Sequence, residues 1–414
     1  METNVFAARR AKLIETLPDN SMTFLFAGDP KQKSNDNDYP FRINNNFYYM
    51  TGMDAPGQVM MIAKLNGKAS QWLFIERPDP IFELFNGKQP TVEEVKEATG
   101  FTYVDYLDRL EYQVGRQLSY YPYDYVLFDL HKAKLDYVAY PENALCKKLI
   151  DAYPNLAVKN VAHTIDNLRR FKTEEEIECI KKAVEITEKG IHSILDHLKP
   201  GVNEAELQAW WDFTLTMNGA KDNAFLPIIA GGKNSCVLHY EENDQVVEDG
   251  DVLQIDLGAE WGYYSADISR CFPVNGKFTE EQKFFYNAVL YGQQKVLEAL
   301  KPGLPLRDTT RIAREAIGEK LMEAGVISDI KEMAQLLPHG VSHYMGLDVH
   351  DVGDIEELKP GMVITVEPGV YLPEKKLGIR IEDDALITED GCIVLSPQIL
   401  RTAEEVEAYM ANRK

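Results

Sequence analysis

The sequence lacks a long apolar stretch, a surplus of basic residues and a leader-like start. No apolar run reaches the ~20 residues that a bilayer-spanning helix needs. The 44 basic side chains are outnumbered by 66 acidic ones, and the net charge of −22 opposes binding to nucleic acid or to an anionic membrane. The first residues carry no apolar segment behind a basic one, as a secretory signal would. We therefore expect a cytoplasmic protein without these partners.

Cysteine is scarce and scattered. The five cysteines are odd in number and show no CxxC spacing: Cys146, Cys179, Cys236, Cys271 and Cys392. A dispersed set of this kind is typical of reduced thiols in a cytoplasmic protein. It argues against a disulfide framework and against a thiolate metal site.

The 414 residues are enough for two domains of about 100–200 residues each. In the first part of the chain, strand-like runs alternate with helix-like stretches, which predicts an α/β domain. The predicted strands lie at 23–28, 47–50, 58–63, 71–75 and 125–129, and the predicted helices at 6–16, 91–98 and 143–152.

A helix start marks the boundary between the two domains. Thr173 followed by Glu176 forms a capping box, which predicts a long helix that ends near Leu198. We therefore place an N-terminal domain at 1–170 and a second domain at 171–414. Beyond this helix the sequence predicts a helix after 203, strands at 225–230 and 236–240, and a long helix from 279 to 300.

The segment 252–270 places acids inside apolar strands. It forms a hydrophobic run with Asp256, a glycine-containing turn, and a second run that begins near Asp267. An acid inside a buried strand costs several kcal/mol unless it is paired or binds a metal ion. Because side chains alternate along a strand, two such acids on neighbouring strands can meet on one face, as metal binding requires.

The same pattern returns further along the chain. The run that contains Asp256 is echoed 111 residues later by a run with Glu367. A second acid follows each copy, Asp267 in the first and Glu382 in the second. A Leu-Lys-Pro-Gly sequence recurs at an offset of 102, and a weaker echo occurs at 104. A repeated strand-turn motif with solvated acids is the alternative, but ordered echoes favour a duplicated α+β unit at 172–414, with one curved sheet and four acids near a pseudo-twofold axis.

Four of the eight histidines lie beside apolar runs: His239, His339, His343 and His350. A single histidine in such a place is usually a core residue whose ring nitrogens have hydrogen-bond partners. Three within the glycine-interrupted segment 337–351 are better explained by a functional site.

These residue types suit a pair of metal ions. One neutral imidazole with four carboxylates favours Mn²⁺, Co²⁺, Zn²⁺ or Fe²⁺ over a thiolate-loving metal. Two ions about 3.5–4 Å apart hold a bridging water and lower its pKa, so that a hydroxide can attack a carbonyl. The remaining histidines would donate hydrogen bonds to the resulting oxyanion and to the substrate.

The order of these residues resembles a known family. Asp256, Asp267, His343, Glu367 and Glu382 follow one another as in the dinuclear pita-bread metallopeptidases. Several stretches are similar to the proline-specific branch, family M24B with aminopeptidase P and prolidase: 34–52, 237–245, 266–270, 339–351 and 365–369. The resemblance implies an α/β N-terminal domain and an α+β C-terminal pita-bread (creatinase/aminopeptidase) domain with an internal pseudo-twofold repeat.

The resemblance also implies the metal ligands. Asp256 and Asp267 would bind metal, with Asp267 bridging two ions, and Glu382 would be the second bridge. His343 would bind one ion. Glu367 would be both a ligand and the proton shuttle for the attacking water. The implied cofactor is two divalent ions, Mn²⁺ first, with Co²⁺, Zn²⁺ or Fe²⁺ as alternatives.

Four more residues would serve the substrate by the same resemblance. His239 and His350 would contact the scissile bond and the proline end, and with Glu367 they form the implied catalytic set. His339 would line the pocket. Arg380 would belong to the substrate site as the partner that orients a metal-binding acid. The alternative for Arg380 is a plain surface cation.

The implied activity is that of an Xaa-Pro aminopeptidase, which removes the N-terminal residue from peptides with proline second by a metal-bridged hydroxide. A prolidase restricted to Xaa-Pro dipeptides is one alternative, and a non-catalytic binding protein on the same fold is another. A homodimer or homotetramer is implied as well. Aromatic side chains of the first domain would pack its core or cover a partner subunit's active site: Phe47, Tyr48, Tyr49, Phe82 and Phe85.

Overall fold

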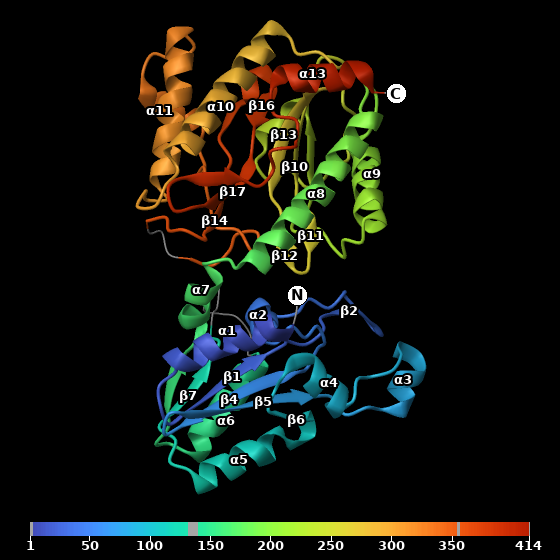
Figure 1. The fold of residues 1–414 in the computed structure, drawn as a ribbon. Coiled ribbons are helices and arrows are strands. Elements are labelled where there is room, and N and C mark those ends of the chain that lie inside the picture. Colours follow the sequence, from blue (N-terminus) through green and yellow to red (C-terminus); the bar gives the residue numbers. More distant parts are fainter. Residues whose placement is uncertain (1–2, 131–139, 354–356, 414) are drawn as a thin grey trace. The chain divides into compact units, whose positions relative to one another are not determined.

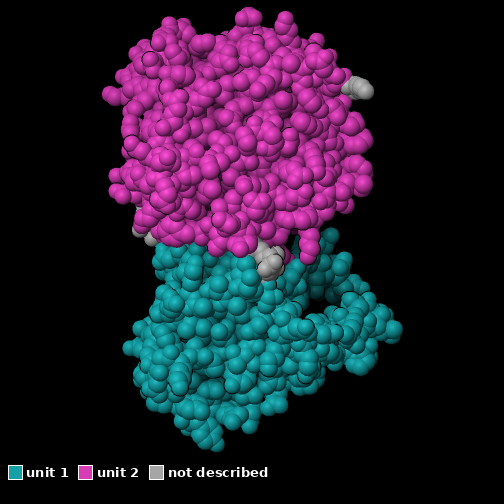
Figure 2. Space-filling model, viewed as in Figure 1, with its two compact units in different colours: residues 1–169 teal, residues 170–414 magenta. Residues whose placement is uncertain are grey.

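The computed structural model describes residues 3–130, 140–353 and 357–413 (Figure 1). The chain divides into two compact units, unit 1 at 1–169 and unit 2 at 170–414 (Figure 2). No helix in the described part of the chain has the length and hydropathy needed to cross a membrane.

Unit 1 is built on a six-stranded sheet. Its strands are β1 Ser21–Phe26, β4 Val59–Leu65, β5 Lys68–Ile75, β6 Tyr103–Tyr106, β7 Tyr125–Phe128 and β8 Ala157–Asn160. The strand order is β6-β5-β4-β1-β7-β8, with β4 antiparallel to both of its neighbours and the remaining pairs parallel. A separate short hairpin is formed by β2 Gln32–Ser34 and β3 Asn37–Asp38.

Helices lie on both sides of this sheet, with α1 and α5 on opposite sides (Figure 1). They are α1 Thr3–Thr16, α2 Asn45–Thr51, α3 Pro80–Asn86, α4 Val92–Thr99, the 3₁₀ turn Leu107–Arg109, α5 Leu110–Tyr120, α6 Pro141–Ala152 and α7 Ala162–Arg169. Val114 of α5 and Leu145 of α6 pack against Phe24, Val126 and Phe128 in one buried cluster. Unit 1 is therefore the α/β arrangement that the sequence predicts.

The strand predicted at 47–50 is wrong, because these residues form helix α2. The Asn44 side chain accepts a hydrogen bond from the Phe47 N–H at the start of the helix, and Gly52 ends it in a left-handed conformation. A short aromatic run fits a strand or a buried helix equally well, so its caps decide. The aromatic residues of α2 are buried, whereas Phe82 and Phe85 of α3 are 49% and 79% exposed.

Two helix pairs flank the short strands of unit 2 (Figure 1). The pairs are α8 Glu174–His197 with α9 Glu204–Met217, and α10 Glu280–Ala299 with α11 Asp308–Glu323. Helix α8 begins at the predicted capping box, where the Thr173 N–H donates to the Glu176 carboxylate at 2.9 Å. Each pair packs closely at a glycine. A Cβ on Gly190 would lie 2.2 Å from the Trp211 ring, and one on Gly292 would lie 2.5 Å from Ile317.

The strands of unit 2 form several small sheets. One joins β9 Ile228–Gly231, β10 Val252–Leu257 and β13 Ile268–Pro273, and another joins β14 Val363–Val366, β17 Asp383–Ile387 and β18 Cys392–Val394. The hairpins are β11 Glu260–Trp261 with β12 Tyr264–Ser265, and β15 Gly369–Leu372 with β16 Leu377–Arg380. The remaining elements are α12 Met333–Leu336, α13 Ala403–Asn412 and the 3₁₀ turns Gly232–Cys236, Ile330–Glu332 and Pro373–Lys375.

The expected single curved sheet is thus interrupted. The chain pairs with β15 up to Arg380 and with β14 from Asp383 onward, so the ladder breaks between these two residues. At the break, the Glu382 N–H donates to the Ser269 carbonyl at 3.0 Å, which joins the two three-stranded sheets. The internal duplication stays a prediction.

The strand predicted at 236–240 is also wrong. This part of the chain follows a 3₁₀ turn and continues as an irregular loop. The Ser235 hydroxyl donates to the Gly232 carbonyl at 2.5 Å and accepts from the Gly378 N–H at 2.7 Å. These bonds hold the 3₁₀ turn that leads into this part of the chain.

Candidate active site

Unit 2 contains a cavity of about 430 Å³. All nine residues that the sequence singled out line it: His239, Asp256, Asp267, His339, His343, His350, Glu367, Arg380 and Glu382. Asp256 lies in β10 and Arg380 ends β16, while the other seven lie in loops or directly beside strand ends. The fold therefore brings together residues that are far apart in the sequence.

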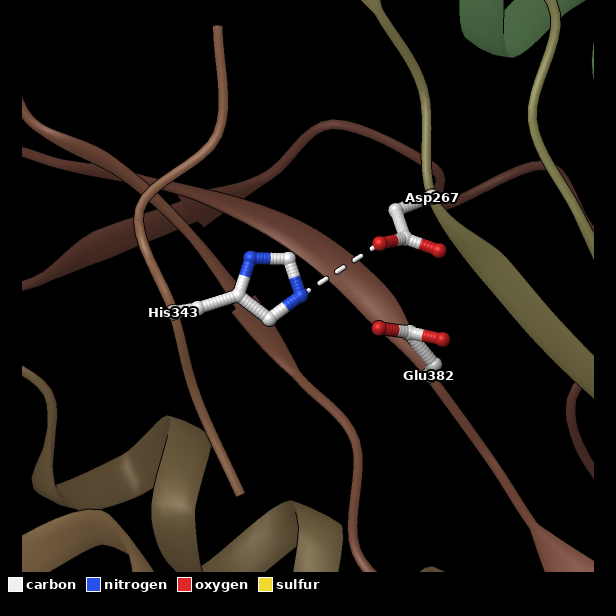
Figure 3. Close-up of side chains that lie close together, drawn as sticks. All are labelled: Asp267, His343 and Glu382. Atoms are coloured by element: carbon white, nitrogen blue, oxygen red, sulfur yellow. Dashed lines mark ion pairs between the residues drawn. The ribbon is translucent and has the colours of Figure 1, made fainter. Parts of the chain in front are cut away.

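Three of these side chains form a tight cluster (Figure 3). Asp267 directly precedes β13, Glu382 directly precedes β17, and His343 lies in the coil ahead of β14. One ligand atom from each residue lies within 4.8 Å of the other two. His343 faces both carboxylates, with its Nε2 3.4 Å from Asp267 Oδ2. This spacing fits a shared metal ion.

Local hydrogen bonds fix the orientation of His343. Its Nδ1 lies 3.0 Å from the carbonyl oxygen of Tyr344 and donates to it. Its backbone N–H donates to Thr365 Oγ1 at 3.2 Å, and the Thr365 N–H donates back to its carbonyl at 3.0 Å. With Nδ1 holding the proton, Nε2 presents its lone pair to the acids, which is the arrangement of a metal-binding histidine.

Glu367 and Asp256 complete the acidic lining. Glu367 Oε1 lies 3.5 Å from His343 Nε2, and its backbone N–H donates to the Val341 carbonyl at 2.9 Å. Asp256 Oδ2 accepts from Arg380 Nη2 at 2.6 Å. Asp256 Oδ1 is buried, and no described residue donates a hydrogen bond to it. Such an oxygen is costly in the interior, so it fits the role of a cation ligand.

The four acids crowd one another. Burial, followed by the charges of neighbouring carboxylates, raises the pKa of both Asp267 and Glu382 well above the usual values. Burial raises the pKa of Glu367 to about 7. Divalent cations would offset both the cost of burying these charged carboxylates and the repulsion between them. A donor set of carboxylate oxygens and one imidazole nitrogen fits ions such as Mn²⁺ or Zn²⁺.

Arg380 donates hydrogen bonds that connect two of the acids. In addition to its bond to Asp256, its Nε donates to Ser269 Oγ at 2.8 Å and its Nη1 to the Tyr371 hydroxyl at 3.0 Å. Ser269 Oγ donates in turn to Glu382 Oε2 at 2.8 Å. Two of the acids are thereby oriented by one connected network, and Arg380 is not the surface cation of the alternative interpretation.

Two of the remaining histidines, His339 and His350, have a lowered pKa, which favours the neutral ring. Burial lowers the pKa of His339 to about 4, and its Nε2 lies 2.9 Å from the Tyr371 hydroxyl. Burial, and then the charges of His343 and His239, lower the pKa of His350. The rings of His350 and His343 meet edge to face with centroids 4.2 Å apart. Each neutral ring offers one N–H donor.

Comparison with known proteins identifies the family. The family model described as metallopeptidase family M24 matches residues 178–389, and the one described as the aminopeptidase P N-terminal domain matches residues 6–125. The chain belongs to metallopeptidase family M24. As a member of a metallopeptidase family it is a hydrolase, and its family implies divalent metal ions.

Similar proteins match this M24 peptidase over its whole length. An Xaa-Pro aminopeptidase of Escherichia coli (strain K12) is 32% identical over 441 residues, which cover 99% of the chain and 98% of the relative. A solved structure of a proposed aminopeptidase P from Bacillus anthracis is 42% identical with a TM-score of 0.98 and covers 100% and 99% of the two chains. Zinc-substituted aminopeptidase P of E. coli, solved in complex with product, is 30% identical with a TM-score of 0.92 and covers 100% and 99%.

These matches confirm two predictions. The resemblance to the Xaa-Pro aminopeptidases of family M24B is confirmed, as is the fold, with an aminopeptidase P N-terminal domain followed by a pita-bread domain.

Several residues at this M24 site were missed in the sequence. Ser269, Thr365 and Tyr371 hold the ligand-type side chains in place. Ser269 and Thr365 had a signal, since each lies at the strand spacing of two from a predicted ligand, Asp267 or Glu367. Apolar residues of the cavity wall were missed too: Phe225, Leu226, Ile228, Leu238 and Val349. Apolar side chains give no signal that separates a pocket wall from a core.

Proposed function

We propose that this protein is a metal-dependent aminopeptidase that removes the first residue from peptides with proline in the second position. One observation carries the proposal. Asp267, His343 and Glu382 converge within 4.8 Å in a cavity that Asp256 and Glu367 also line. The likeness in both units to proteins named Xaa-Pro aminopeptidase supports this specificity.

The five ligand-type residues would hold two divalent ions. Asp267 and Glu382, which face each other across the cluster, would be shared between the ions, and His343 would bind one of them. We propose Mn²⁺, with Co²⁺, Zn²⁺ and Fe²⁺ as substitutes, because the donors are mainly carboxylate oxygens. When bound, two such ions lower the pKa of a water toward neutrality and polarise the scissile carbonyl.

Proton transfer would fall to Glu367. A carboxylate beside the attacking water can both accept and return a proton. It would take a proton from the attacking water and pass it to the departing proline nitrogen. His239 and His350 would donate hydrogen bonds to the substrate carbonyl, which strengthen as its oxygen gains negative charge.

The site suits an Xaa-Pro bond in three ways. Proline has no backbone N–H, so a largely apolar wall leaves none of its donors unsatisfied. His339 would line the proline side of the pocket. The free α-amine of the first residue would be drawn to the acidic cluster, which favours cleavage at the N-terminus. Arg380 would act on the substrate indirectly, through its bond to Asp256.

A peptide-length assay tests the proposal. Protein stripped with EDTA and reloaded with Mn²⁺ is given an Xaa-Pro dipeptide, an Xaa-Pro-Xaa tripeptide and a tripeptide with alanine in place of proline. We expect release of the first residue from the tripeptide with proline, dependence on added metal, and little cleavage of the alanine peptide. Cleavage of the dipeptide alone would instead identify a prolidase. No cleavage of any peptide would support a non-catalytic binding protein.

We further propose that the protein is a cytoplasmic homodimer or homotetramer. The free thiols of its five cysteines suit a reducing compartment. Sedimentation velocity would give the oligomeric state, and fractionation of the source cells would give the location. A monomer at all concentrations, or recovery outside the cytoplasm, would contradict these two proposals.

A further inference from the structure

One buried carboxylate holds the irregular segment 231–245, which contains His239. Glu204 is the first residue of α9 and has no exposed surface. It accepts four hydrogen bonds from this segment: from the Gly231 N–H (2.8 Å) and Asn234 Nδ2 (3.2 Å) at Oε1, and from the Tyr240 hydroxyl (2.8 Å) and the Gln245 N–H (2.9 Å) at Oε2. The carboxylate thus connects the beginning, the middle and the end of the segment.

The chemistry of this contact is unusual for a buried acid. Among the described residues, no lysine, arginine or histidine forms an ion pair with Glu204. A buried carboxylate without a cation is costly unless donors satisfy both oxygens, and here each oxygen accepts two hydrogen bonds. Hydrogen bonds to an ionised acceptor are also about twice as strong as neutral ones. These four hydrogen bonds therefore hold the chain beyond Gly231, where β9 has ended and no regular backbone ladder continues.

Tyr240 links this contact to the cavity. Its side chain is buried and bonded to Glu204, whereas the residues on either side of it, His239 and Glu241, line the cavity. Burial and the bond to Glu204 raise the pKa of Tyr240, so its hydroxyl remains a donor. Fixing the side chain at 240 on one side of the chain leaves its neighbours directed to the other.

The surrounding backbone is built for this close contact. A Cβ on Gly231 would lie 2.4 Å from Val247 and 3.4 Å from Glu204 Oε1, so glycine lets the backbone N–H reach the carboxylate. Asn243 has a φ of 45°, a left-handed conformation that asparagine tolerates better than most residues. Its side chain accepts from the Ile229 N–H at 2.9 Å and braces the same segment from β9.

We propose that Glu204 is a positioning residue, which acts through Tyr240 to aim His239 at the scissile bond. This inference rests on the proposed function for the role of His239. Glu204 does not line the cavity itself and would touch neither substrate nor metal.

The test compares Glu204→Gln and Tyr240→Phe with a matched control. Tyr264→Phe removes the same kind of bond elsewhere in unit 2, since the Tyr264 hydroxyl donates to the buried Glu176 carboxylate at 2.8 Å. Kinetics with an Xaa-Pro-Xaa peptide, metal content and thermal unfolding are measured for all three variants. Tyr240→Phe guards against the possibility that Glu204→Gln fails to fold, because it deletes a single hydroxyl.

We expect losses that depend on the position of His239. Misplacing a catalytic group by about 1 Å costs on the order of 10²-fold, so Glu204→Gln should lower kcat by about that factor, with the metal content unchanged. Tyr240→Phe, which removes one of the four bonds, should lose about tenfold, and Tyr264→Phe should retain activity. In a His239→Ala background, either substitution should cause little further loss, because effects through one residue are not additive.

The position of His239 can be read without activity. In protein with isotope-labelled histidine rings, the resonance missing from His239→Ala identifies this residue. It should shift in Glu204→Gln and Tyr240→Phe and stay in place in Tyr264→Phe. An unchanged resonance in the first two variants, or fully additive kinetic losses, would overturn the proposal. If the resonance shifts but the wild type cleaves no Xaa-Pro peptide, the positioning of His239 holds and the proposed function fails.

Discussion

Burial of acids should make the metal-free protein lose stability as the pH rises, and Glu367 makes this effect measurable. Burial raises the pKa of its carboxyl from 4.5 to about 7. Between these two values the folded protein binds more protons than the unfolded chain, so a rising pH lowers the free energy of unfolding until it passes about 7. The difference between 4.5 and about 7 corresponds to about 3 kcal/mol.

Glu367→Gln should remove this loss, since glutamine resembles the protonated acid and cannot ionise. After exhaustive EDTA treatment, we expect the variant and the wild type to be about equally stable at pH 4.5, the unperturbed value of the acid. At about pH 8 the variant should be more stable by about 3 kcal/mol. Urea denaturation gives both free energies. Glu389→Gln, which changes an exposed carboxylate, is the control and should show no comparable gain.

At about pH 8, added Mn²⁺ should remove most of the variant's advantage, because the ionised wild-type carboxylate is the better ligand. Free metal at one hundred times its Kd stabilises the folded state by about 2.7 kcal/mol, and the gain should be smaller in Glu367→Gln. Two results would refute this reasoning. One is that metal-free Glu367→Gln exceeds the wild type in unfolding free energy by the same amount at both pH values. The other is that it does not exceed the wild type at about pH 8.

Three further predictions concern other residues of unit 2. Asp267→Asn should lower kcat roughly 10²-fold or more and reduce bound metal while the fold persists, as measured by kinetics, elemental analysis and circular dichroism. Ser269→Ala removes the hydroxyl that donates to Glu382 and should lower activity by about 10–100-fold, so unchanged kinetics would count against the network. Asp351→Asn removes the carboxylate that lies 2.9 Å from the buried Lys172 ammonium. Urea denaturation should show a loss of about 3–5 kcal/mol of unfolding free energy. A loss below about 1 kcal/mol would contradict a buried ion pair.

The strand acids were visible in the sequence because a charge inside an apolar run has few structural explanations. Asp256 and Glu367 stood out for that reason, and the clustering of His339, His343 and His350 pointed to the same place. The resemblance to known metallopeptidases then gave the fold and an expected role for each residue. The structure brings all of them into one cavity.

What the sequence did not predict depends on contacts between distant residues. Glu204 looks like an ordinary acid in the first turn of a helix, and its bond to Tyr240 spans 36 positions. The segment 236–240 looks like a strand by composition, but it follows a turn that a bond between Ser235 and Gly378, 143 positions apart, holds in place. Tertiary partners of this kind leave no local periodicity. At 47–50, by contrast, the caps Asn44 and Gly52 are local and stand in the sequence, and they decide for the helix.

The bond between Ser269 and Glu382 spans 113 positions, and the sheets that meet there come from separate parts of the chain. During synthesis, a ribosome-bound chain that stops before Glu382 would present Asp256 and Asp267 without this acid. The centre would therefore assemble only after Glu382 has been added. A shorter nascent chain would have no means of trimming the peptides around it.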